Sequence, residues 1–170
     1  MFILNFIIGY LEYKKYYDKK ILFFILNILS LSCYFFLPKY IFYLLPLVIS
    51  QILIDFKKLE LSDINNLVIF INGLIYSFYT NHFEWKSLIL LTLIYLIIFL
   101  LPTETIGFGD VKLIFAIALF VPIKCIILYI FYPLLIALFI GFFYYHFKKS
   151  KEFPMGPCIL LYFIISNWRF

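Results

Sequence analysis

The 170 residues are 66% hydrophobic and 24% aromatic, and the mean hydropathy is +1.07. Because soluble domains are roughly 45 to 50% apolar, this composition excludes an ordinary water-soluble protein and predicts an integral membrane protein bound by lipid. We attribute the net charge of +5 to loop lysines that orient helices, and we expect no nucleic-acid partner. No Pro/Gly/Ser-rich linker interrupts the chain, which predicts a single membrane domain over residues 1–170.

Apolar segments follow one another along the chain, and several approach the roughly 20 residues that a straight helix needs to cross a bilayer. They predict an all-α, polytopic membrane helix bundle of about 6–8 transmembrane segments. The opening segment is short, and we expect partial insertion at most. The segment after Gly107 is also short and ends at Pro122, so we expect it to begin inside a cavity. The expected segments are residues 1–11, 21–37, 40–55, 64–80, 86–101, 108–122, 124–146 and 156–168.

Lysines predict the orientation of these segments, since short loops rich in Lys and Arg stay on the cytoplasmic side. Alternating crossings put nine of the fourteen basic residues on one side, namely Lys14, Lys15, Lys19, Lys20, Lys57, Lys58, Lys148, Lys149 and Lys151. Two crossings, 64–80 and 86–101, separate the loop after Asp55 from the loop before Asp110. Both acids are therefore expected at the cytoplasmic face of an inner, or cytoplasmic, membrane, where they can be neighbours in space.

Asp55 is the first of these acids and follows the apolar segment 40–55. A carboxylate at the end of a helix faces an unfavourable dipole, which Lys57 and Lys58 offset only in part. An ionisable residue at the hydrocarbon boundary costs a few kcal/mol, so its presence needs a reason. The alternative is a solvated loop acid beside two lysines.

Asp110 opens the segment that follows Gly107, Phe108 and Gly109. The start of a helix favours an ionised carboxylate, and the glycines permit a close backbone approach and non-helical angles. Two roles are open for Lys112. It supports the site, or its long side chain only carries the ammonium group to the membrane surface. Taken alone, Asp110 also fits an ordinary N-terminal helix acid after a glycine turn.

Two carboxylates in a partly dry site form a coupled pair, because like charges resist double ionisation and one acid keeps a proton near neutral pH. Such a pair can hydrolyse a peptide bond without a metal: one carboxylate activates water while the protonated partner polarises the carbonyl.

Three segments carry a resemblance to a known family. IGFGDVKL at 106–113 resembles the GxGD signature of membrane aspartyl peptidases, in the G-x-G-D-x-K-L form of prepilin peptidases. IDFKKLELSDINNLV at 54–68 is similar to the family segment in which a helix-ending Asp precedes a second acid about eight residues on. FPMGPCILL at 153–161 is similar to the family's FGP segment before the last helix. The resemblance, to the prepilin and preflagellin peptidases, covers about residues 45–168.

The resemblance implies that Asp55 and Asp110 are catalytic and that Asp63 occupies the secondary acidic position. Gly107, Phe108, Gly109, Lys112, Gly156 and Pro157 are then motif residues. The implied reaction removes a short basic leader from type IV prepilin-like or pseudopilin-like proteins, just before their hydrophobic helix. The implied enzyme is an aspartic-type endopeptidase without a cofactor.

The chain departs from many bacterial members in one respect. It has three cysteines and no CxxC pair, so it lacks the pattern of their zinc-binding cytoplasmic domain, and residues 12–20 leave only a short basic loop for one. We therefore expect no metal site and doubt methylation of the new N-terminus.

Two other functions remain open. Intramembrane acids also occur in small ion-coupled carriers, but these place acids near mid-membrane and often show repeated halves. The chain could also be an inactive membrane scaffold that keeps the fold and has lost the activity.

Overall fold

The computed structural model describes residues 1–17, 20–35, 37–81, 83–100, 107–148 and 153–167. Within these ranges the chain forms eight α-helices and no β-strand, which confirms the predicted all-α fold. The helices are α1 Phe2–Tyr16, α2 Ile21–Ser30, α3 Lys39–Lys58, α4 Asp63–Thr80, α5 Trp85–Leu100, α6 Phe108–Ile117, α7 Ile126–Lys148 and α8 Gly156–Ser166. Short 3-10 helices cover Leu31–Phe35, Ala118–Phe120 and Ile123–Cys125.

The opening segment differs from its prediction. We expected a segment ending at residue 11 and a basic loop from residue 12, but α1 continues to Tyr16 and includes Glu12. It packs along α3, where the two backbones come very close: a Cβ on Gly9 would lie 2.8 Å from the carbonyl oxygen of Pro46. α1 is therefore a packed helix of the bundle.

The segment predicted at 21–37 also differs, because the α-helix stops at Ser30 and a 3-10 helix follows. The Ser30 hydroxyl donates to the Asn27 carbonyl at 2.7 Å, and the Ser32 hydroxyl to the Leu29 carbonyl at 2.6 Å. Such local bonds compete with regular helical hydrogen bonding and favour a tighter turn. The segment predicted at 108–122 differs in the same way, because α6 stops at Ile117 and a 3-10 helix covers Ala118–Phe120. The other helix limits agree with the sequence to within a few residues, and the predicted ends at residues 101 and 168 lie outside the described residues.

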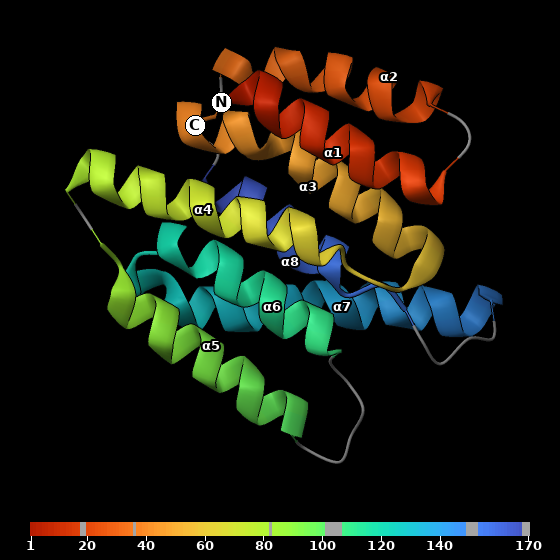
Figure 1. The fold of residues 1–170 in the computed structure, drawn as a ribbon. Coiled ribbons are helices and arrows are strands. Elements are labelled where there is room, and N and C mark those ends of the chain that lie inside the picture. Colours follow the sequence, from red (N-terminus) through yellow and green to blue (C-terminus); the bar gives the residue numbers. More distant parts are fainter. Residues whose placement is uncertain (18–19, 36, 82, 101–106, 149–152, 168–170) are drawn as a thin grey trace.

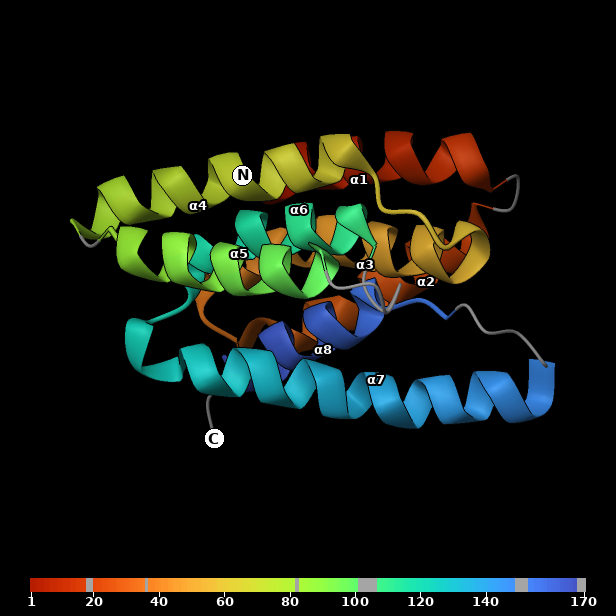
Figure 2. The same cartoon turned by 90° about the horizontal axis from the view of Figure 1, so that it is seen from below.

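α3 contacts helices on several sides. It contacts α1 and α2 on one face and α8 on another, and it also contacts α4 (Figure 1). α6 contacts α4, α5 and α8, and α8 lies between α7 and the rest of the bundle (Figure 2). The ends of α1 and α3 and the starts of α4 and α6 lie toward the same end of the bundle (Figure 1). This end contains the residues of the sequence motifs.

Two described segments are long and apolar enough to cross a membrane, Lys39–Lys58 and Ile123–His146. They differ in burial: 67% of the apolar window is buried within the protein for the first and 22% for the second. The second includes most of α7, whose large side chains, such as Leu138 and Phe142, are largely exposed. Contiguous apolar surface of this kind needs an apolar surrounding, which a bilayer provides.

Candidate active site

A pocket of about 370 Å³ brings Asp55 and Asp110 together at this end of the bundle. Asp55 comes from the last turn of α3 and Asp110 from the first turn of α6, 55 positions later in the chain. Both are buried, with 4% and 8% of their surface exposed. The pocket is also lined by Leu59, Glu60, Leu61, Asp63, Gly107, Phe108, Gly109 and Lys112. Two acids and the GFGD loop thus share one cavity.

Asp55 is held by the segment that opens α8. Its Oδ2 accepts a hydrogen bond of 2.9 Å from the backbone N–H of Gly156, the first residue of that helix. Pro157 follows at the next position, where a proline is well tolerated because that N–H has no partner within the helix. The positive end of the α8 dipole therefore offsets the unfavourable dipole of α3. The sequence did not predict this contact, which spans 101 positions.

Gly156 allows this approach because it has no side chain. A Cβ at this position would lie 2.8 Å from Asp55 Oδ2 and 2.7 Å from Leu61 Cδ2. Distances below 3.0 Å would force one of these groups to move. The MGP segment is thereby assigned a physical role, which is to bring a backbone donor into contact with a buried carboxylate.

Asp110 is held within its own helix start. Its Oδ2 accepts from the backbone N–H of Gly107, the residue that caps α6, at 3.1 Å. This is the reciprocal half of a capping box. Gly107 is extended, with φ of −77°, and none of the glycines among the described residues has a positive φ. Gly107 therefore has the non-helical angles expected before Asp110, in a region that other residues can also adopt.

Asp63 and Lys112 form an ion pair that connects the two motif loops. Lys112 Nζ lies 2.8 and 3.0 Å from the two carboxylate oxygens of Asp63, and it also lies 5.0 Å from the centre of the Phe108 ring. Both side chains are partly exposed at the rim of the pocket. Asp63, the secondary acid of the sequence motif, thus binds Lys112 of GFGDVK. Among the described residues, no hydrogen bond or ion pair joins Asp63 to Asp55 or Asp110.

Leu61 packs between the segments that carry the acids. Its side chain lies 2.7 Å from the position of a Cβ on Gly156 and 3.4 Å from that of a Cβ on Gly109. The loop between α3 and α4 therefore contacts both the GFGD loop and the start of α8. Leu59 ends α3 in the left-handed region, with φ of 57°, and turns the chain into this loop.

A buried polar network holds the same loop from the other side, and sequence reasoning missed it. The Ser62 hydroxyl donates to Glu12 Oε2 at 2.6 Å, and Glu12 also pairs with Lys15. Gln51 Oε1 accepts from the Ser62 backbone N–H at 3.3 Å and from the Asn65 side-chain amide at 3.1 Å. Glu12, Gln51 and Ser62 are all buried.

A signal for Glu12 was present in the sequence. It is an ionisable residue next to an apolar segment, which is the criterion that identified Asp55. The neighbouring Lys14 and Lys15 made it appear to belong to a loop. Gln51 and Ser62 gave no comparable signal, because their partners lie on other helices.

The sequence also matches a model of a known protein family. Residues 40–144 match the model described as the type IV leader peptidase family. Comparisons with curated proteins and with solved structures gave no match. The match covers more than half of the 170 residues and includes both acids and the GFGD loop, so the chain belongs to the type IV leader peptidase family.

Proposed function

We propose that the chain is a membrane aspartyl endopeptidase that removes the basic leader of type IV prepilin-like proteins, with Asp55 and Asp110 as the catalytic pair. The observation that carries the proposal is the shared pocket, in which two buried carboxylates from distant motifs lie with the GFGD loop. Membership of a peptidase family supports hydrolysis of a peptide bond, and the acids supply the groups that this reaction requires.

The two acids would divide the chemistry between them. The ionised carboxylate takes a proton from water, whose oxygen attacks the carbonyl carbon, while the protonated partner donates to the carbonyl oxygen. The resulting tetrahedral diol then collapses: the C–N bond breaks, the leaving nitrogen receives a proton, and the pair returns to one protonated and one ionised acid. Backbone donors at Gly156 and Gly107 orient the carboxylates throughout.

We propose a multi-pass arrangement in an inner membrane with this pocket at the cytoplasmic face. Lys14 and Lys15 lie in the last turn of α1, and Lys57 and Lys58 in the last turn of α3, at the end of the bundle that holds the acids. Lysines of this kind favour the cytoplasmic side. A basic leader arriving from the cytoplasm would then meet the pocket directly, and its hydrophobic helix would stay in the bilayer.

Cleavage of a prepilin-like peptide by purified protein in lipid tests the proposal. Asp55→Asn and Asp110→Asn should each abolish cleavage while the protein keeps its unfolding temperature. Glu60→Gln is the matched control, since it removes an exposed acid from the rim of the same pocket and should retain most activity. Cleavage by either Asn variant would remove that acid from the mechanism, and an inactive wild type would favour a carrier or scaffold.

A further inference from the structure

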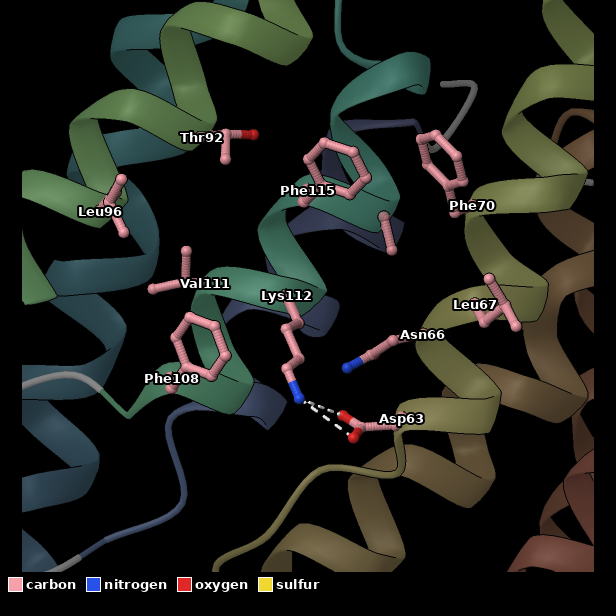
Figure 3. A pocket seen from close by; sticks show the side chains of 11 residues that line it. Asp63, Asn66, Leu67, Phe70, Thr92, Leu96, Phe108, Val111, Lys112 and Phe115 are labelled. Atoms are coloured by element: carbon pink, nitrogen blue, oxygen red, sulfur yellow. Dashed lines mark hydrogen bonds and ion pairs between the residues drawn. The ribbon is translucent and has the colours of Figure 1, made fainter.

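An apolar groove continues from the acid pocket along the side of the bundle. It has a volume of about 530 Å³ and lies between α4, α5 and α6 (Figure 3). Asp63, Phe108 and Lys112 line both cavities, so the ion pair forms the rim between them. Beyond the rim the walls include Leu67, Phe70, Leu96 and Phe115.

Asn66 places an unpaired donor in this groove. The residue is 4% exposed, and its Nδ2 has no hydrogen-bond partner among the described residues. Its nitrogen points into the groove, near Lys112 (Figure 3). Burial of an unsatisfied amide donor costs about 1–3 kcal/mol, so such a group needs a reason.

Neighbouring contacts fix the orientation of this amide. The backbone N–H of Ser62 can only donate, so the oxygen of Gln51 must face it. The Gln51 nitrogen then donates to Asn66 Oδ1 at 3.1 Å. Exchanging the oxygen and nitrogen of Asn66 would place two donors against each other. The Asn66 nitrogen is therefore held toward the groove.

Thr92 gives a second unpaired polar atom on the opposite wall. It lies on α5, and its buried Oγ1 also has no partner in the described part of the chain. A lipid chain offers no acceptor to a donor amide or a hydroxyl. A peptide in extended conformation offers main-chain carbonyls together with apolar side chains, which fits both polar atoms and the apolar walls.

We infer that this groove binds the substrate segment that follows the cleaved bond, with the Asn66 side-chain amide donating to a main-chain carbonyl of that segment. The inference rests on the proposed function and adds the path of the substrate. A peptide bond held between the two acids must lie in an extended segment. The residues that follow it therefore have main-chain carbonyls that make no helical hydrogen bonds. They would pass the Asp63–Lys112 rim, meet Asn66, and enter the bilayer as the apolar helix begins.

Photo-crosslinking tests the path without requiring turnover. The probe is a fluorescent peptide with a lysine-rich leader followed by a leucine-rich helix, and the protein carries Asp110→Asn so that the probe stays intact. Benzoylphenylalanine in place of Phe70 should crosslink to residues after the cleavage position, as mapped by mass spectrometry. The same group in place of Phe139, an exposed aromatic residue of α7, should not. Equal labelling at both positions, or labelling of lipid alone, would overturn the path.

Asn66→Asp tests the donor, because it keeps the oxygen that accepts from Gln51 and removes the amide hydrogens. In otherwise wild-type protein we expect KM to rise and kcat/KM to fall about three- to tenfold. The control is Ile71→Ala, at an exposed position on the same helix, which should leave both constants unchanged. A lower unfolding temperature with unchanged KM would show a structural role and overturn the assignment. Cleavage by the wild type without a crosslink at position 70 would reject the groove and leave the peptidase proposal standing.

Discussion

α3 and α7 are both long and apolar, yet they carry different chemistry. α3 buries Ser50, Gln51 and Asp55 against neighbouring helices. In contrast, α7 has no Asp, Glu, Asn, Gln, Lys or Arg from residue 126 to residue 145, and most of its surface is not covered by protein. Polar groups are thus found in the helix where other helices supply partners, as the cost of an unpaired polar group in hydrocarbon requires.

The strongest test of this comparison replaces Gln51 with Leu. The change removes the partner of the buried Ser62 backbone N–H and of the Asn66 side-chain oxygen, and one of the two acceptors of the Asn65 amide. We therefore expect the free energy of unfolding to fall by about 3 kcal/mol. On α7, Leu138→Ala alters a side chain that is 70% exposed and should cost within about 0.5 kcal/mol. Thermal unfolding in detergent measures both. Similar losses of unfolding free energy in the two variants would contradict the difference between α3 and α7.

Gly156→Ala tests the contact between α3 and α8. The added methyl group would displace Asp55 or Leu61, so we expect kcat to fall roughly 10- to 100-fold, which corresponds to about 1.4–2.7 kcal/mol of activation free energy. The control on α7 is Gly141→Ala, where the new Cβ would lie 3.2 Å from the Phe153 ring and that side chain can adjust. Its activity should change by less than about twofold, on the scale of a surface substitution. A fully active Gly156→Ala variant would show that Asp55 does not need this contact.

Glu12 offers a graded test of the network that supports α3. Glu12→Ala removes the acceptor for the Ser62 hydroxyl, and we expect a loss of about 1–2 kcal/mol in unfolding free energy. Glu12→Gln keeps an acceptor and should recover at least half of that loss. Equal losses would assign the stabilisation to the ion pair with Lys15 instead. Chemical unfolding of the three proteins distinguishes the outcomes.

The smallest expected effect concerns the end of α3. Leu59 has a positive φ that favours glycine, so Leu59→Gly should raise stability by up to about 1 kcal/mol. Lys58→Gly, one residue earlier and still helical, should instead lower stability by about 1 kcal/mol. The opposite signs, read from unfolding midpoints, would show that the backbone at residue 59 is strained. A loss in both variants would mean that the leucine side chain contributes more than its strain costs.

The sequence predicted the helices well where apolar runs end at polar residues, as at α4 and α5. Lysine positions and the three motifs also predicted which helix ends meet. What it did not predict were contacts between motifs, such as the Gly156 N–H to Asp55 and the Lys112 ion pair to Asp63. Such contacts depend on how helices pack in three dimensions, and no local pattern encodes them. For the same reason, the partners of Glu12 and Asn66 became visible only in the structure.

Two polar side chains of α1 have hydrogen-bond partners that are synthesised much later than α1 itself. Asn5 exchanges hydrogen bonds with Asn72, and Glu12 accepts from Ser62, so their partners are made 67 and 50 residues later. During translation, α1 therefore emerges with only part of its polar contacts available, such as the ion pair between Glu12 and Lys15. The hydrogen bonds of α1 to α4 and to the loop before it can form only after α4 has been synthesised. The two acids themselves meet later still, because Asp110 lies on α6 and the Gly156 donor to Asp55 lies on α8.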